Sequence, residues 1–487
     1  MKILLASSEV HPYSKSGGLA DMVGALGKTL ANLNHEVGII SPLYAGIRER
    51  FPDIQPLRYD LSLQMGSKLV DGKVWYLHGP AGQHLYFIEN NHYFNRSNYY
   101  TEQGSDYPDN DERFFFFSKS VAFLAQNLPW HPEIIHVHDW QVGLVPLLVR
   151  HAAQQGNWKQ APATLFTIHN LAYQGVFPAS SYSLTNLPDD HFRFEEVEFY
   201  GQMNCLKSGI VFADLLTTVS PSYAKEITTE EFGCGLDPLL RIRRNELLGI
   251  LNGVDYAEWN TTHNSALPAP YTVNDLRGKA INKAFVQQEL GLPVRSESPL
   301  FGNVSRLAEQ KGVDICLEAL DALLAADIQF ALLGNGQPEF EAAFQALATR
   351  YPEKVAVRIG YNHALAHRIE AGADFFLMPS RFEPCGLNQM YSLRYGTIPI
   401  VRATGGLDDT IIDDTEDDLR ANGLKFHEYS ALALIQAMRK ALRIHADTPL
   451  LLRYRQNGMV ADFSWNQTAG EYIRAYKDAK TRAQKRT

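Results

Sequence analysis

The sequence has few cysteines, no long apolar segment and no excess of positive charge. Its cysteines are Cys205, Cys234, Cys316 and Cys385. They stand far apart and form no C-x-x-C pair, which argues against a disulfide framework or a cysteine zinc site and fits a reducing compartment. No apolar run approaches the roughly 20 residues that a membrane-spanning helix requires. The apolar run at the N-terminus is too short for a signal peptide. We therefore expect a cytoplasmic protein with no membrane partner.

The charge balance excludes further classes of partner. The chain carries 45 basic and 54 acidic residues, a net charge of −9, which argues against a nucleic-acid partner, although a local basic cleft remains possible. With 487 residues, of which 45% are hydrophobic, the chain is long enough for two to three domains that each bury a core.

A segment near the C-terminal third carries the clearest functional pattern. Residues 373–378 read as a buried parallel strand, residues 387–395 as a helix, and residues 397–401 as a second strand. Glu383 lies in the loop after the first strand, where ligands bind in open α/β sheets. A carboxylate between Phe and Pro at this position has no obvious packing role, so we expect it to serve a ligand.

The N-terminal segment has a related arrangement. Residues 2–8 read as a buried strand, and a helix is expected to begin at Asp21. Between them lie Lys15, Gly17 and Gly18, which could hold a phosphate with one cation and backbone amides. The pattern is neither G-x-G-x-x-G nor a Walker loop, and a plain tight turn explains it equally well.

Strand-loop-helix units repeat along the chain and predict parallel sheets covered on both faces. The expected strands span residues 35–41, 84–89, 134–138, 164–167, 214–219, 247–251, 299–305, 328–333 and 355–359, and the expected helices residues 112–127 and 274–290. The Tyr- and Asn-rich residues between 89 and 111 are long enough to form a lid or an acceptor surface. Residues 256–272 read as a linker between two domains.

Histidines gather at the ends of two of these strands. His136, His138 and Asp139 could be read as metal ligands. His136 and His138 point the same way on a strand, but no third ligand to join these two is evident nearby. Polar groups that bind sugar hydroxyls are the alternative, and His136 could simply be a hydrogen-bonded core residue. His169 and Asn170 follow the next strand in the same way.

A basic loop opens the second domain. Arg306 and Lys311 are expected in the loop after strand 299–305, five residues apart and just before a helix. Arg can hold two phosphate oxygens at once and Lys acts as a point charge, so the pair suits a diphosphate. A solvated charged loop is the alternative.

Together these motifs closely resemble the bacterial glycogen synthase and plant starch synthase family. They are residues 15–21 (KSGGLAD), 106–114 (DYPDNDERF), 136–144 (HVHDWQVGL), 167–175 (TIHNLAYQG), 251–255 (LNGVD), 305–312 (SRLAEQKG), 381–396 (RFEPCGLNQMYSLRYG) and 404–407 (TGGL). The resemblance covers nearly the whole chain. It implies an α/β GT-B fold in which two Rossmann-like, doubly wound parallel-sheet domains face a cleft.

The resemblance also implies a division of the chain. Residues 1–255 would form the acceptor-side domain and residues 256–460 the donor-side domain. Residues 461–487 would hold a helix that crosses back to the first domain. The run from residue 465 to 479 is amphipathic, and the basic end from residue 480 is expected to fray.

The resemblance implies site residues as well. The residues expected to act in catalysis are Glu383, Arg306, Lys311, Asp139 and, through its backbone, His169. The residues expected to bind substrate are Lys15, Gly18, Asp21, Asn170, Asn252, Tyr361, Cys385, Gly386, Leu387, Thr404 and Gly405. The family's Lys-Thr-Gly-Gly is Lys-Ser-Gly-Gly here, which keeps the charge and the amides. Tyr391 occupies the position of a second glutamate of the wider superfamily and is not expected to be catalytic.

The activity implied is retaining transfer of α-glucose from ADP-glucose to the non-reducing 4-hydroxyl of glycogen or another α-1,4-glucan. No metal or other cofactor is expected, because Lys15, Arg306 and Lys311 would neutralise the diphosphate. Glu383 is expected to position sugar hydroxyls, with covalent attack on the anomeric carbon left open. The alternatives are a retaining glycosidase, which needs no phosphate site, a glucan phosphorylase with a pyridoxal cofactor, and a non-catalytic glucan- or nucleotide-binding protein.

Overall fold

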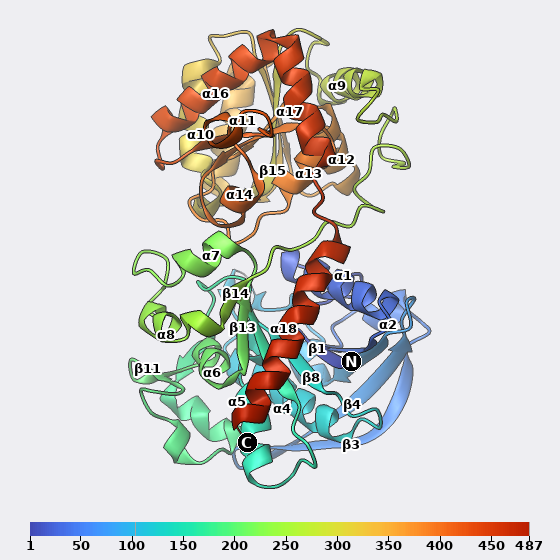
Figure 1. Cartoon of the computed structure of the whole chain (residues 1–487), viewed down its shortest axis with the longest axis vertical. Coiled ribbons are helices and arrows are strands. Elements are labelled where there is room, and N and C mark those ends of the chain that lie inside the picture. Colours follow the sequence, from blue (N-terminus) through green and yellow to red (C-terminus); the bar gives the residue numbers. More distant parts are fainter. Residues whose placement is uncertain (103, 487) are drawn as a thin grey trace. The chain divides into compact units, whose positions relative to one another are not determined.

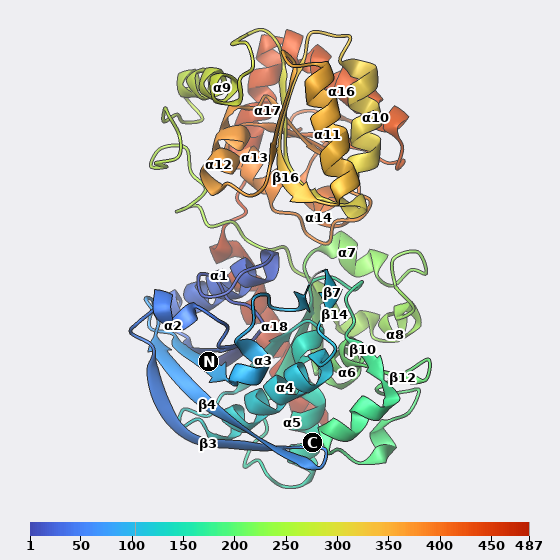
Figure 2. The same ribbon diagram turned by 180° about the vertical axis from the view of Figure 1, so that it is seen from behind.

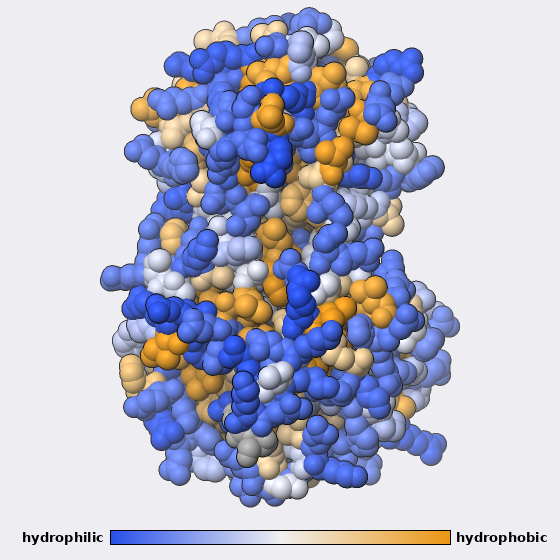
Figure 3. All heavy atoms as spheres, in the orientation of Figure 1, coloured by the Kyte–Doolittle hydropathy of each residue, from blue (hydrophilic) through white to orange (hydrophobic). Residues whose placement is uncertain are grey.

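The computed structural model describes residues 1–102 and 104–486. Its contacts divide the chain into two compact units. The first comprises Met1–Val219, Ala224–Ile250 and Trp465–Thr487, and the second Ser220–Tyr223 and Leu251–Ser464. Within the described residues, no helix combines the length and apolar character needed to cross a membrane. On the face drawn in Figure 3, polar residues predominate and apolar ones are scattered.

The first unit is built on a large twisted sheet with the strand order β14-β13-β9-β8-β1-β2-β5-β4-β3. Its strands are β1 (Lys2–Ala6), β2 (Glu36–Pro42), β3 (Gln55–Met65), β4 (Lys68–His78), β5 (His84–Glu89), β8 (Ile134–His138), β9 (Ala163–Ile168), β13 (Leu215–Thr218) and β14 (Leu247–Gly249). The strands from β14 to β5 run parallel, as expected. The hairpin β3–β4 is antiparallel and extends the sheet beyond β5, so an all-parallel sheet was wrong at this edge.

Helices cover both faces of this sheet. They are α1 (Gly18–Asn32), α4 (Asn110–Asn127), α5 (Val145–Gln154), α6 (Cys205–Phe212), α8 (Asp237–Ile242) and α18 (Trp465–Arg486). Figure 1 shows α18 across one face, and Figure 2 shows α4 and α5 on the opposite face. The C-terminal helix α18 contacts α1, β9 and β13, which confirms that it returns to the first unit.

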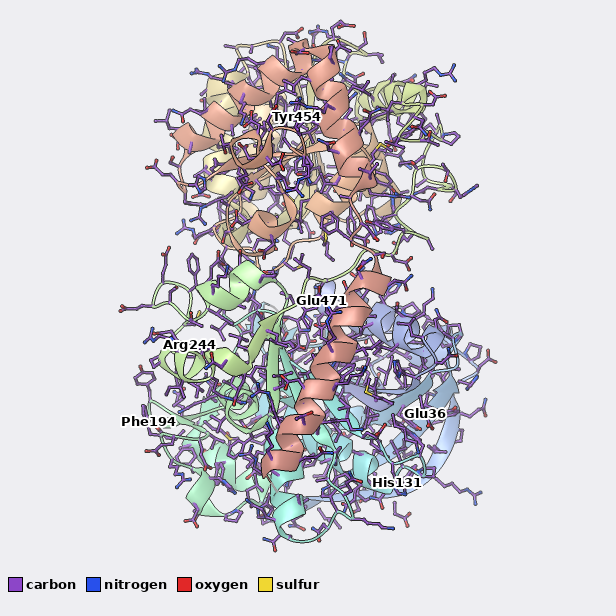
Figure 4. The ribbon with its side chains drawn as sticks, in the orientation of Figure 1. Glu36, His131, Phe194, Arg244, Tyr454 and Glu471 are labelled. Atoms are coloured by element: carbon purple, nitrogen blue, oxygen red, sulfur yellow. The ribbon has the colours of Figure 1, made fainter. Side chains whose placement is uncertain are left out.

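Buried side chains fix α18 to the sheet. Ala469, Tyr472, Tyr476 and Ala479 are at most 1% exposed, whereas Glu471 is exposed (Figure 4). The prediction that the chain frays from residue 480 was wrong. Lys480 pairs with Glu133, and the helix continues to Arg486.

Part of the first unit lies outside the main sheet. Its elements are α2 (Ile47–Arg50), α3 (Asn91–Phe94), β6 (Thr101–Glu102), β7 (Ser105–Asp106), β10 (Val176–Pro178), β11 (Glu198–Phe199), β12 (Gln202–Asn204) and α7 (Pro221–Glu226), of which α7 is shared with the second unit. The predicted loop between residues 89 and 111 therefore contains α3, β6 and β7, while its residue 103 lies outside the described residues.

The second unit holds a parallel sheet with the order β17-β16-β15-β18-β19-β20. Its strands are β15 (Leu300–Leu307), β16 (Gln329–Gly336), β17 (Val355–Ile359), β18 (Phe375–Met378), β19 (Ile398–Arg402) and β20 (Leu424–Phe426). Its helices are α9 (Arg277–Leu290), α10 (Val313–Leu323), α11 (Pro338–Arg350), α12 (His363–Gly372), α13 (Asn388–Arg394), α14 (Gly405–Thr410), α15 (Asp414–Asp417), α16 (Ala431–Ala446) and α17 (Thr448–Val460).

Alternating side chains of these strands feed two cores, as the period of a strand requires. Phe375 and Leu377 pack with α10, α11, α16 and α17, whereas Phe376 and Met378 pack with α13 and α14. Tyr454 on α17, labelled in Figure 4, is 1% exposed in the first of these cores. The sheet is therefore buried on both faces, which confirms the doubly wound arrangement.

One strand boundary differs from the prediction at a site residue. Arg306 lies within β15, opposite Asn335 of β16, and not in the loop that follows. Gly334 and Gly336 explain the extension, because a Cβ at these positions would lie about 2 Å from the carbonyl oxygens of Ser305 and Leu307 (2.1 Å and 2.2 Å). The glycines allow the two backbones to stay paired for two further residues.

Candidate active site

The second unit brings Lys311 and Glu383 together at the carboxyl ends of β15 and β18. Lys311 Nζ lies 2.6 Å from Glu383 Oε2. The Glu383 side chain is 8% exposed, and Ser380 Oγ donates to the same carboxylate oxygen at 2.9 Å. A lysine ammonium has three donors, so Lys311 can hold Glu383 and still bind an anionic oxygen.

Gly312 fixes the position of this pair. It has a φ of 68° between the short helix η5 (Glu309–Lys311) and α10. A Cβ at Gly312 would lie 1.9 Å from the carbonyl oxygen of Pro379. Only glycine allows this approach and this φ at little cost, and the contact places Lys311 beside the loop that carries Glu383.

Arg306 is exposed at the same end of the sheet. Its Nη2 lies 3.5 Å from Gln310 Oε1, the outer limit of a hydrogen bond. Gln310 in turn donates to the carbonyl oxygen of Phe382. The guanidinium is therefore weakly held and available to a ligand.

The loop at Thr404 packs directly on the backbone around Glu383. Thr404 is the N-cap residue of α14, and the Gly406 N–H donates to the carbonyl oxygen of Glu383 at 3.1 Å. A Cβ at Gly405 would lie 2.1 Å from that same oxygen, and a Cβ at Gly406 2.1 Å from the oxygen of Cys385. The paired glycines are thus needed for the two loops to touch.

The second unit holds several other predicted substrate-binding residues. Cys385 is buried, and burial raises the pKa of its thiol to about 12, opposed by the backbone N–H of Asn252. Asn252 is buried, and its Oδ1 has no hydrogen-bond partner among the described residues. Gly386 has a φ of 70°, and Leu387 is the N-cap residue of α13. Tyr361 is 76% exposed in the segment after β17.

The first unit brings together a separate group of predicted residues. Lys15 Nζ lies 2.7 Å from Asp21 Oδ1, in the first turn of α1. The helix begins at Gly18, three residues earlier than predicted, and its N-cap residue Gly17 provides no side-chain cap. The first amides of α1 therefore keep their donors for another partner.

A buried carboxylate that sequence reasoning missed holds this loop. Glu9 is 2% exposed and accepts hydrogen bonds from the backbone N–H and the hydroxyl of Ser16. Tyr100 OH donates to it at 2.6 Å, and Tyr99 OH accepts from the Lys15 N–H at 3.3 Å. The sequence signal was a glutamate directly after the first buried strand. Its partner in the loop between residues 89 and 111 could not be seen from sequence.

Asp139 lies at the end of β8 in a strained backbone conformation. It has a φ of 60° and a ψ of −177°, a region that non-glycine residues rarely adopt and that clusters at functional sites. Its Oδ1 accepts the N–H of His169 at 2.7 Å. Burial raises the pKa of Asp139 to about 7, against hydrogen bonds from the backbones of His169 and Asn170.

The neighbouring histidines are neutral. Burial lowers the pKa of His169 to about 3 and the pKa values of His136 and His138 well below their usual range. His136 bonds to Tyr476 OH at 3.0 Å and Thr167 Oγ1 at 2.6 Å, as a core histidine should. His138 Nδ1 lies 3.1 Å from His169 Nε2, while His138 Nε2 is buried without a partner among the described residues.

The two doubly wound sheets, each with polar groups at the carboxyl ends of its strands, together with the family models below, make this a glycosyltransferase of the GT-B fold. The family model for the starch synthase catalytic domain matches residues 2–242, and that for glycosyl transferases group 1 matches residues 288–459. The chain belongs to the bacterial glycogen synthase and plant starch synthase family.

Individual relatives agree over nearly the full length. The chain is 48% identical to a glycogen synthase of Anaeromyxobacter dehalogenans over 98% of this chain and 99% of the relative. It is 47% identical to a glycogen synthase of Myxococcus xanthus over 98% and 99%.

Solved structures agree as well. The catalytic domain of starch synthase IV from Arabidopsis thaliana, bound to ADP and acarbose, matches with a TM-score of 0.90 and 33% identity over 99% of each chain. A sucrose-phosphate synthase from Thermosynechococcus elongatus, with a TM-score of 0.59 and 18% identity over 98% of each chain, shares the fold.

Proposed function

We propose that this enzyme transfers α-glucose from ADP-glucose to the 4-hydroxyl at the non-reducing end of an α-1,4-glucan, with retention of configuration. The observation that carries the proposal is the Lys311–Glu383 pair beside an exposed Arg306. The pair and Arg306 would offer cations to a diphosphate beside a carboxylate that can accept from sugar hydroxyls. The relatives named as glycogen synthases, and the starch synthase bound to ADP and acarbose, support this donor and acceptor.

In the proposed reaction, the bond between glucose C1 and the β-phosphate oxygen breaks while a bond from C1 to the acceptor O4 forms. The proton of the acceptor hydroxyl passes to the departing diphosphate. Arg306 and Lys311 stabilise the negative charge that grows on the phosphate oxygens, because fixed cations need no reorganisation as the charge develops. In the first unit, Lys15 and the amides at Gly18 are proposed to bind donor phosphate.

Glu383 is proposed to position the sugar rather than to attack it. Its Oε2 is held by both Lys311 and Ser380, which lowers the nucleophilicity of this oxygen. Oε1 remains to accept hydrogen bonds from sugar hydroxyls. Asp139, together with the backbones of His169 and Asn170, is proposed to contact the transferred glucose.

The remaining predicted residues complete the proposed donor site. Tyr361 and Asn252, whose Oδ1 lacks a partner among the described residues, would contact the nucleoside. The wall formed by Cys385, Gly386, Leu387, Thr404 and Gly405 would lie against the donor. The cytoplasmic location belongs to the same proposal, since the cysteines of the described chain are free thiols.

Transfer is proposed to need no divalent metal, because the side-chain cations take its place at the diphosphate. The test is incorporation of radiolabelled glucose into glycogen from ADP-glucose and from UDP-glucose, each with and without excess EDTA. We expect faster incorporation from ADP-glucose and little effect of EDTA. No incorporation from either donor would refute the transfer, and loss with EDTA that magnesium restores would refute the metal-free mechanism.

A further inference from the structure

A cluster of potential metal ligands lies in the second unit, among residues to which the proposed reaction gives no role. Glu258, His363 and His367 each offer one ligand atom, and these atoms all lie within 4.8 Å of one another. Glu258 Oε1 lies 2.8 Å from His363 Nε2, and the Nε2 atoms of His363 and His367 are 3.4 Å apart. We propose that these residues form a binding site for a divalent metal cation, and that the ion bound is zinc.

The spacing of the ligand atoms suits zinc. Bonds of about 2.0–2.1 Å in a tetrahedral site place ligand atoms about 3.3 Å apart. The separation of the two histidine nitrogens is close to this value, and the shorter Glu258–His363 distance needs only a small side-chain rotation. Both of these side chains are partly exposed, 41% and 51%, so they are free to make it.

The local structure explains why the two histidines share a face. They are four residues apart at the start of α12, whose N-cap residue Asn362 accepts the N–H of Leu365 at 2.9 Å. Residues at i and i+4 of a helix lie one above the other. Glu258 comes from the segment after β14 and supplies the carboxylate from a different part of the chain.

Neighbouring groups orient the buried histidine. His367 is 2% exposed, and its Nδ1 lies 2.7 Å from Tyr395 OH. Asn264 Nδ2 lies 3.1 Å from the same Nδ1. The tautomer that donates from Nδ1 to Tyr395 OH is the one that leaves the lone pair of Nε2 for a metal, as outer partners do in zinc sites. Trp259 stacks on the His367 ring with centroids 4.0 Å apart, which fixes the plane of the ring.

The donor set selects the kind of cation. Imidazole nitrogens bind zinc well, whereas magnesium and calcium prefer oxygen ligands. Three protein ligands with two partly exposed side chains leave a fourth position for water. Because Glu258 and the histidines lie on different segments, the bound ion would tie residues near 258 to the first turns of α12.

The test is calorimetric titration of the full chain, made without a histidine tag and treated with chelator, with zinc and separately with magnesium. We expect one zinc per chain and no magnesium binding by these residues. His363→Ala and Glu258→Gln should each weaken zinc binding by at least about 10-fold, the lower end of the effect of disturbing a metal site. His427→Ala, which removes an exposed histidine of the same unit, should bind zinc as the wild type does.

Two further readouts separate binding here from loss of fold or binding elsewhere. Zinc should raise the Tm of the wild type but not of Glu258→Gln, whose shape is unchanged. Cobalt should give the visible absorption of a tetrahedral site in the wild type only. Absence of stoichiometric zinc uptake, or equally tight zinc binding by His363→Ala, would overturn the proposal.

Discussion

The ion pair between Lys311 and Glu383 stabilises the charged, nearly buried carboxylate of Glu383 and fixes the position of the Lys311 ammonium. The glutamate is nearly buried, and an unpaired buried carboxylate is costly, so Lys311 offsets much of that cost. Because the ammonium has three donors, Lys311 can hold Glu383 and a phosphate oxygen of the donor at the same time, which leaves Glu383 Oε1 for sugar hydroxyls. This coupling would link the phosphate and sugar parts of the proposed site at the scale of one side chain.

Replacing Glu383 tests this division of labour. Glu383→Gln keeps the size of the side chain but removes its charge, so glucosyl transfer should fall by at least about 10²-fold, the scale of one lost electrostatic contact. ADP binding, measured by calorimetry, should stay close to that of the wild type. Glu339→Gln, at an exposed glutamate in the first turn of α11, is the matched control. If Glu383→Gln loses ADP affinity instead, the residue belongs to the nucleotide site.

Arg306 offers a second test. Arg306→Lys keeps the positive charge but loses the planar fork that holds two phosphate oxygens. Steady-state kinetics should show kcat lower by roughly 10²-fold, while Arg420→Lys, an exposed arginine of the same unit, should be unchanged. Near-normal turnover in Arg306→Lys would rule out a bidentate role.

Asp139 should make the folded protein less stable as pH rises from about 4 to 7. The usual Asp pKa of 3.8 is raised to about 7 in the folded protein, so between these values the folded state holds a proton that the unfolded state has lost. Stability is then fully present below pH 4 and is lost as pH rises through 7. The shift corresponds to at most about 4 kcal/mol, and partial exposure of Asp139 lowers this figure.

The measurement is Tm from pH 5 to pH 8 for the wild type and for Asp139→Asn. The asparagine can still accept the His169 N–H but does not titrate. We expect the Tm of the variant minus the Tm of the wild type to increase as pH rises. Parallel curves would show that Asp139 titrates at its ordinary pKa.

At the scale of elements, glycines decide which loops can touch. Gly312, Gly405 and Gly406 each bring their own backbone against a carbonyl oxygen of the loop from Pro379 to Cys385. These contacts join the ends of β15, β18 and β19 into one surface. Sequence periodicity predicted the strands, but it could not show which backbone each glycine approaches.

Gly312→Ala should therefore lower the free energy of unfolding by more than the strained φ alone would. Gly291 is the matched control, because it has a φ of 81° but no atom within 4 Å of an added Cβ. Gly291→Ala should lower the free energy of unfolding by about 1–2 kcal/mol, because alanine is strained in the left-handed conformation. Gly312→Ala should lower Tm further and also reduce transfer, because Lys311 is displaced. Equal Tm values for the two variants would contradict the close contact with Pro379.

The sequence predicted most elements for a physical reason. Buried parallel strands are continuous apolar runs, so β5 and β8 have the predicted bounds. The edge strand β17, which is only partly buried, has them too. The β3–β4 hairpin was not predicted, and all but a few of its residues are exposed or half-buried. The end of β15 was misplaced because Arg306 reads as a loop residue, while glycines on β16 let the pairing continue.

At the scale of the molecule, the chain's end returns to its beginning. Helix α18 packs on α1, β9 and β13, and Tyr476 bonds to His136 from 340 residues away. Amphipathic spacing indicated the helix, and the family resemblance supplied its destination. Contacts such as Glu9 with Ser16 and Tyr100 needed the folded chain, because no local pattern links them.

The central claim is retaining glucosyl transfer from ADP-glucose to a glucan, and proton NMR of that reaction with a short maltooligosaccharide tests it most directly. We expect a growing α-1,4 anomeric signal, with one ADP released for each linkage formed. A β-anomeric product, or free glucose in place of a longer chain, would contradict it. So would glucan shortening to glucose-1-phosphate when inorganic phosphate is added, since that is the reaction of a phosphorylase.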